Sequence, residues 1–163
     1  MRLLAIIAVL VFVVDQATKY AVVFGLDLIN LGVIDVSPPF LRFVMAWNRG
    51  VNFGVLAAGS DIARWALVAL SLAIAIGLVW WAHQRRRDRW FLIGAGLVVG
   101  GALGNIVDRA LFGAVMDFLN MSCCGLTNPY VFNVADIAIF AGAGVLIATS
   151  GETKKAKTEK GEP

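Results

Sequence analysis

The hydrophobic residues of this chain gather in four long runs, and polar residues are largely confined to the segments between them. Each run is close to the roughly 20 residues that an α-helix needs to cross a bilayer. The pattern therefore predicts a membrane protein of the all-α class, with residues 1–150 as one domain. The four transmembrane helices are expected at about residues 3–24, 62–82, 90–112 and 130–149.

Two segments lie outside these runs. The connector 25–61 is long for a link between helices, and its stretch 40–47 is rich in strand-forming residues. We therefore expect a small β-structure in the connector. The last segment, 151–163, is rich in lysine, glutamate and threonine, and we expect it to be a disordered tail.

Basic residues indicate the orientation of the helices. If the four helices alternate in direction, Arg2, the arginines of 85–89 and the tail lysines all fall on one side of the membrane. Cytoplasmic segments carry the excess of lysine and arginine, so both termini are predicted to face the cytoplasm. The connector then lies on the outer, extracytoplasmic side.

Composition agrees with this picture. The chain is 60% hydrophobic and 15% charged, whereas soluble domains are usually about 45–50% apolar and about 25% charged. The formal charge of +3 resides on loops and tail rather than along a groove. We therefore expect no nucleic-acid partner, and nothing in the sequence requires more than a monomer.

A few polar residues interrupt the apolar runs, and their predicted depths agree. At 1.5 Å per residue, Asp15 lies about 18 Å above the cytoplasmic end of its helix, and Asn105 and Asp108 lie about 22–27 Å above theirs. Asp136 lies about 9 Å below the outer end of the last helix. One layer in the outer half of the bilayer is therefore predicted to hold Asp15, Asn105, Asp108, Asp117, Asn133 and Asp136.

Helical spacing predicts contacts within and below this layer. Asp15 and Lys19 are four residues apart, which is the spacing of an intrahelical salt bridge, and Asn133 and Asp136 are three apart. Small residues at every fourth position of the third run are expected to bring that helix close to its neighbours. These residues are Gly96, Gly100 and Gly104.

The sequence disfavours several kinds of hydrolytic site. The single histidine, His83, belongs to the cytoplasmic side, so neither a Ser-His-Asp triad nor a zinc site is expected in the outer layer. Cys123 and Cys124 are adjacent, and we expect unpaired thiols, with a vicinal or intermolecular disulfide as the alternative. No metal and no cofactor are expected.

Carboxylates remain as the groups for chemistry. If Asp117 and Asp136 meet in a poorly solvated site, their like charges keep one of them protonated near neutral pH. Such a pair can act as the acid and base of an aspartic peptidase. Spacing alone does not decide whether they meet. The residues therefore favour a hydrolase and a proton-coupled transporter equally, with a structural bundle of buried ion pairs as the third alternative.

Five sequence blocks occur in the order found in one known family. They are residues 15–19 (DQATK), 48–50 (NRG), 100–109 (GGALGNIVDR), 115–118 (VMDF) and 132–136 (FNVAD). The chain resembles the bacterial lipoprotein signal peptidases, or type II signal peptidases, over nearly its whole length. It departs from the family at Val51 and Asn52, where small residues are usual, and in 121–127, which has no counterpart that aligns.

The resemblance implies an aspartyl endopeptidase of the bacterial inner membrane with its site at the extracytoplasmic face. Its partners would be membrane lipids and diacylglyceryl-prolipoproteins, which are cleaved immediately before the lipidated cysteine. By motif position, Asp117 and Asp136 would be catalytic. Substrate binding would fall to Asn48, Gly50, Asn105, Arg109 and Asn133, and structural support to Asp15, Lys19 and Asp108. A transporter and a non-catalytic lipoprotein-binding module are the rival interpretations.

Overall fold

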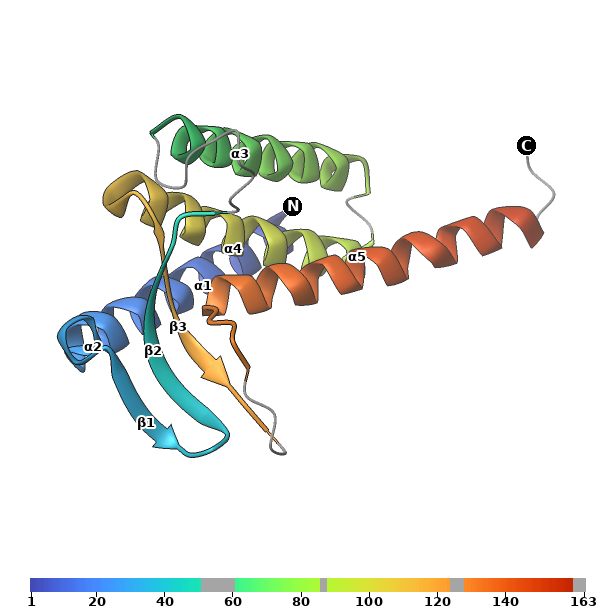
Figure 1. Cartoon of the computed structure of the whole chain (residues 1–163). Coiled ribbons are helices and arrows are strands. Elements are labelled where there is room, and N and C mark those ends of the chain that lie inside the picture. The colour runs from blue at the N-terminus through green and yellow to red at the C-terminus, as the bar shows by residue number, and fades with distance from the viewer. Residues whose placement is uncertain (51–60, 86–87, 124–127, 160–163) are drawn as a thin grey trace.

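The computed structural model describes residues 1–50, 61–85, 88–123 and 128–159. Four long helices pack side by side, and a small sheet extends from one end of the bundle (Figure 1). The elements are α1 (Arg2–Lys19), the π-helix η1 (Tyr20–Gly25), α2 (Leu28–Leu31), β1 (Val33–Ser37), β2 (Leu41–Asn48), α3 (Asp61–Gln84), α4 (Arg89–Phe112), β3 (Val115–Met121) and α5 (Val134–Glu159).

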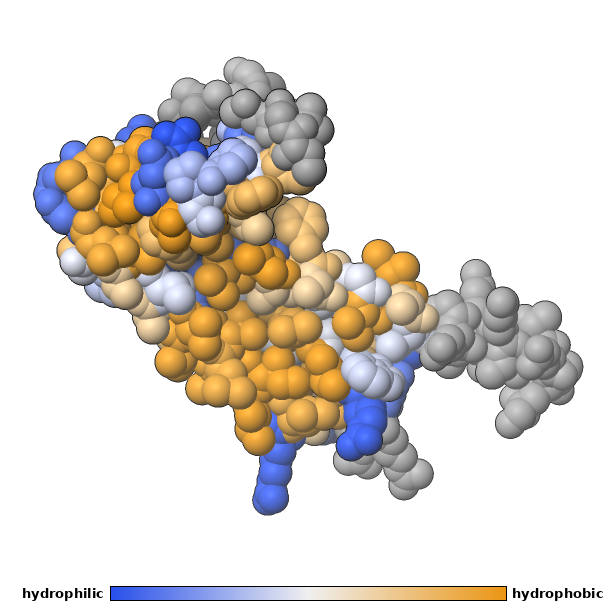
Figure 2. Space-filling view, turned by 90° about the horizontal axis from the view of Figure 1, so that it is seen from below, coloured by the Kyte–Doolittle hydropathy of each residue, from blue (hydrophilic) through white to orange (hydrophobic). Residues whose placement is uncertain are grey.

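Within the described ranges, three helices are long and apolar enough to cross a membrane. They are α1 with its π-helical extension (Arg2–Gly25), α3 and α4. The apolar part of α5 is shorter, Val134–Thr149, so the fourth crossing stays a prediction. Figure 2 shows an extended hydrophobic surface over the helices with hydrophilic residues toward its margins, as a chain surrounded by lipid requires.

Both ends of α5 differ from the sequence-based expectation. The helix begins at Val134 rather than near residue 130, because the side chain of Asn133 accepts a hydrogen bond from the backbone N of Asp136 at 2.9 Å and caps the first turn. At the other end the backbone stays helical to Glu159, where a disordered tail was expected. Residues 152–159 contain neither proline nor glycine to stop the helix.

Helix α4 lies between α1, α3 and α5 and is the most buried of the four. The predicted stripe of glycines explains how closely it approaches α1. A Cβ atom on Gly100 would lie 2.6 Å from the carbonyl oxygen of Ala8, and one on Gly104 would meet the carboxylate of Asp15. On its other side, a Cβ on Gly101 would lie 2.5 Å from the carbonyl oxygen of Ala135. The packing role predicted for this stripe is confirmed.

The sheet is antiparallel, with the strand order β1-β2-β3. The β1–β2 hairpin is the β-structure expected in the connector, but the sequence analysis missed β3. Strand β3 follows α4 and pairs with β2 so that Asp117 lies opposite Ala46. It forms through this pairing with a distant segment, and buried Phe118 packs on Val22 and Leu28 beneath the sheet. The third strand matters because it carries Asp117.

Cys123 follows β3 and is disulfide-bonded. The expectation of unpaired thiols is therefore wrong for this residue, and the disulfide alternative is correct. Cys123 is exposed and lies outside the apolar helices. Cys124 lies outside the described residues.

Candidate active site

A buried cation lies where α1 meets α4. The Nζ atom of Lys19 is 2.8 Å from Oδ2 of Asp15 and 2.7 Å from Oδ2 of Asp108, and all three side chains are fully buried. It also donates a 3.3 Å hydrogen bond to Oδ1 of Asn105. The predicted salt bridge between Asp15 and Lys19 is confirmed. A buried charge needs this degree of pairing to be tolerated.

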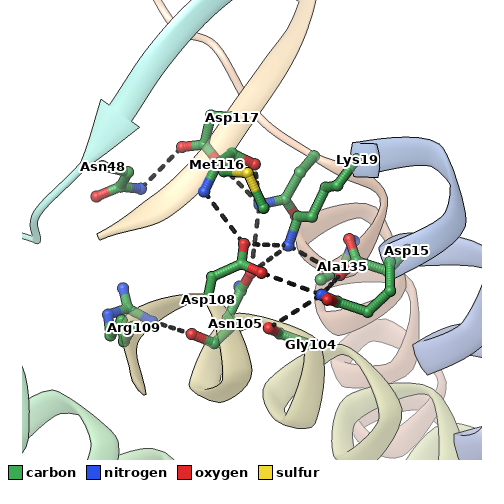
Figure 3. A network of polar contacts seen from close by, with 12 residues as sticks. Asp15, Lys19, Asn48, Gly104, Asn105, Asp108, Arg109, Met116, Asp117 and Ala135 are labelled. Carbon is green, nitrogen blue, oxygen red and sulfur yellow. Dashed lines mark hydrogen bonds and ion pairs between the residues drawn. The ribbon is translucent and has the colours of Figure 1, made fainter. Parts of the chain in front are cut away.

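The two carboxylates of this cluster also bind the backbone next to each residue of the candidate catalytic pair, Asp117 and Asp136 (Figure 3). Asp15 accepts a 2.9 Å hydrogen bond from the backbone N of Ala135, which immediately precedes Asp136. Asp108 accepts a 3.1 Å hydrogen bond from the backbone N of Met116, which immediately precedes Asp117. The ion cluster therefore links α1 and α4 to both segments that carry the pair.

One member of the cluster was not singled out from the sequence. The side-chain amide of Gln16 donates to Asp108 at 3.0 Å and to Asp15 at 3.2 Å. Its position between Asp15 and Lys19, as a polar residue inside an apolar run, was the available signal.

Three asparagines hold the side chains of Asp117 and Asp136. Asp117 accepts from Asn133 at 2.6 Å on Oδ1 and from Asn48 at 3.0 Å on Oδ2. Asp136 accepts from Asn105 at 2.9 Å. Asn133 also donates to Oδ1 of Asn105 at 3.2 Å, so the supports of the two carboxylates are joined to each other.

The two carboxylates also interact electrostatically. Burial and then the negative charge of Asp136 raise the pKa of Asp117 to about 7, against the hydrogen bonds from Asn48 and Asn133 and the positive charge of Lys19. A carboxyl group with this pKa is protonated in a large fraction of molecules at neutral pH. A carboxyl pKa near the operating pH is the property that a general acid requires.

Gly50 and Arg109 lie at the margin of this network. The backbone N of Gly50 donates a 3.0 Å hydrogen bond to Oδ1 of Asn48, which orients the amide toward Asp117, and its φ of 94° favours glycine. Arg109 makes a long 3.5 Å contact to the carbonyl oxygen of Asn105, and its charge interacts with Asp136 and Asp117.

All ten residues selected from the sequence thus lie in or beside one network, and their individual roles stay predictions. The departures at Val51 and Asn52 lie outside the described residues. In the part of the chain that the structure describes, no three or more His, Cys, Asp or Glu side chains converge as metal ligands.

Comparison with known proteins assigns this chain to a family. The family described as signal peptidase (SPase) II matches residues 7–151. The chain belongs to the signal peptidase II family. Members of this family are peptidases, and the apolar helices show that this member is a membrane protein.

Relatives of known name agree with the signal peptidase II assignment. The lipoprotein signal peptidase of Methylobacterium radiotolerans is 47% identical over 159 residues, covering 95% of this chain and 91% of the relative. That of Methylorubrum extorquens is 46% identical over 148 residues, covering 91% and 84%.

A solved structure described as a bacterial membrane enzyme has the same fold. It shares a TM-score of 0.76 and 28% identity with this chain, and the match covers 94% of this chain and 90% of the other.

Proposed function

We propose that this chain is an aspartyl endopeptidase that removes the signal peptide from diacylglyceryl-modified prolipoproteins by cleaving immediately before the lipidated cysteine. The names of the relatives support the substrate class. The observation that carries the chemistry is the buried Asp117, whose pKa is raised to about 7 beside Asp136. Asn133 joins the pair, because it donates to Asp117 and accepts from the backbone N of Asp136.

In the proposed mechanism the pair carries one proton, which we place on Asp117. Asp136 takes a proton from a water molecule, and the water oxygen bonds to the scissile carbonyl carbon while Asp117 donates its proton to the carbonyl oxygen. The tetrahedral intermediate then collapses. The C–N bond breaks, the proton held by Asp136 passes to the leaving nitrogen, and the carbonyl proton returns to Asp117.

We further propose that the protein spans the bacterial inner membrane four times as a monomer, with both termini in the cytoplasm. Arg2, Arg85 and Arg89 lie at the ends of α1, α3 and α4 that are opposite the sheet (Figure 1), and the positive-inside rule then places the sheet outside. Asp117 and Asp136, at the sheet end of the bundle, would then meet the scissile bond at the outer membrane interface, where water is available.

A proton-coupled transporter is the main rival. It requires polar groups along a path through the membrane. Among the described residues, the buried polar side chains lie in α1 and α4 toward the sheet, in β3 and at the start of α5: Asp15, Lys19, Asn105, Asp108, Asp117, Asn120 and Asn133. Their restriction to one end of the bundle favours the peptidase.

The deciding experiment is cleavage of a lipidated prolipoprotein by the purified chain in lipid. The same prolipoprotein without diacylglycerol is the control for substrate class. Processing of the lipidated form alone supports the proposal. Binding without turnover would identify a lipoprotein-binding module instead, and carboxylate-dependent proton flux in vesicles without cleavage would identify a transporter.

A further inference from the structure

Arg64 of α3 binds the last turn of the neighbouring helix α4. It lies in the first turn of α3, at the end of the bundle that carries the sheet. Its Nη2 atom donates a 2.6 Å hydrogen bond to the carbonyl oxygen of Ala110. The last carbonyls of a helix have no partner inside the helix, and a cation near them interacts favourably with the helix dipole.

The turn that Arg64 contacts leads directly to Asp117. Gly113 ends α4 with a φ of 79°, and its backbone N donates to the carbonyl oxygen of Arg109. The chain then enters β3 at Val115. A Cβ atom placed on Gly113 would lie 3.8 Å from Nη1 of Arg64, so the guanidinium lies against this turn as well as against the helix end.

The other contacts of Arg64 contribute little to stability. The nearest carboxylate is that of Asp61, 3.7 Å away and with 87% of its side chain exposed, which makes a weak ion pair. The Nε atom of Arg64 is buried and has no hydrogen-bond partner among the described residues. A buried polar atom without a partner disfavours folding, so the favourable contact of Arg64 is the one with the carbonyl oxygen of Ala110, in the turn that leads to Asp117.

We propose that Arg64 is a positioning residue for the catalytic pair: it holds the end of α4 and the following turn so that Asp117 stays within hydrogen-bond reach of Asn133, which also binds the backbone of Asp136. This inference rests on the proposed peptidase function. Asp108 holds the same segment from inside the bundle through the backbone N of Met116. Loss of Arg64 therefore loosens the turn without releasing it completely.

The test compares Arg64→Gln and Arg64→Lys with Arg42→Gln. Arg42 is the matched control because it pairs with Asp35 on the exposed surface of the sheet. For each variant in the same lipid, kcat, KM and the pH dependence of kcat are measured on a lipidated prolipoprotein, together with thermal unfolding. The pH dependence is read from Asp117, whose carboxyl group interacts with Asp136 of α5, Lys19 of α1, Arg109 of α4 and Asn48 of β2.

For Arg64→Gln we expect kcat to fall by about tenfold or more with KM changed by less than about twofold, because positioning acts on the chemical step. The alkaline limb of the pH profile shifts to lower pH, since the pKa of Asp117 falls when Asp117 moves away from Asp136. Arg64→Lys regains part of the rate, because an ammonium group also donates to a carbonyl oxygen but lacks the planar fork.

Two results overturn the inference. The first is a kcat within about twofold of wild type with an unshifted limb, as expected for Arg42→Gln. The second is a lower kcat with an unshifted limb, which reduces Arg64 to a structural residue. If Arg64→Gln does not accumulate, Arg64→Lys carries the same comparison. A wild-type chain that does not cleave overturns the proposed function itself, whereas normal wild-type cleavage with unaffected Arg64 variants overturns this inference alone.

Discussion

Replacing the buried lysine of the ion cluster tests how the site is supported. Lys19→Met keeps an unbranched side chain of similar length but removes the charge between Asp15 and Asp108, which lie 2.8 and 2.7 Å from Nζ. Both carboxylates then remain buried without their cation. Breaking a buried ion pair in this way destabilises a protein by about 3–5 kcal/mol.

The matched control is Arg42→Met. Arg42 also forms a short ion pair, 2.6 Å from Asp35, but the two side chains are 46% and 55% exposed. An exposed pair contributes about 0–1 kcal/mol. The comparison therefore separates the effect of burial from the effect of losing a cation.

The assay is reversible unfolding of both variants in the same detergent or lipid, followed by circular dichroism, with cleavage measured below the unfolding transition. We expect Lys19→Met to lose stability by several times more than the control. We also expect its cleavage rate to fall, because Asp15 and Asp108 position the backbone beside Asp136 and Asp117. A loss below about 1 kcal/mol, equal to that of Arg42→Met, would refute the reasoning, because the site would then tolerate two unpaired buried carboxylates.

Further predictions concern Asp117, Asp136 and their surroundings. Asp117→Asn and Asp136→Asn should each lower the cleavage rate by at least about a hundredfold, since each removes a group needed for proton transfer. Both variants should still accumulate in the membrane. Full processing by either variant would exclude the aspartyl mechanism. The wild-type rate should fall as pH rises through about 7, where Asp117 loses its proton. Asn48→Ala should move this limb to higher pH, because the hydrogen bond from Asn48 lowers the pKa of Asp117; an unmoved limb in a pH–rate profile would show that Asn48 does not act on Asp117. Folding raises the pKa of Asp117 from its ordinary value of 3.8 to about 7, so the folded state binds more protons than the unfolded state between these pH values. The contribution of Asp117 to stability therefore decreases as pH rises across that range, and Asp117→Asn should remove this slope from unfolding measurements. Gly104→Ala should destabilise the fold by about 1–3 kcal/mol, because the added Cβ would meet the carboxylate of Asp15. Gly77→Ala is the control and should not destabilise it, because no atom lies within 4 Å of the added Cβ. Equal stabilities of the two variants would contradict the close packing of α4.

Hydrophobic runs and helical spacing determined much of this protein from the sequence alone. Long apolar runs predict membrane-crossing helices because length and hydropathy are properties of each segment by itself. The depths of polar residues predicted one layer, and four-residue spacing predicted both the Asp15–Lys19 salt bridge and the glycine stripe, because the geometry of a helix is regular. The family motifs then selected the residues that the structure joins in one network.

Contacts between distant segments required the tertiary structure. Strand β3 is specified by its pairing with β2, and the cap at Asn133 determines where α5 begins. Lys19 reaches Asp108 as well as its helical neighbour Asp15, and the raised pKa of Asp117 depends on burial and on Asp136. Burial, strand pairing and charge interactions all depend on residues that are far apart in the chain, so local spacing cannot reveal them. The sequence determined which carboxylates to consider, and only the tertiary structure decided that Asn133 links them and that burial and the charge of Asp136 raise the pKa of Asp117 to about 7.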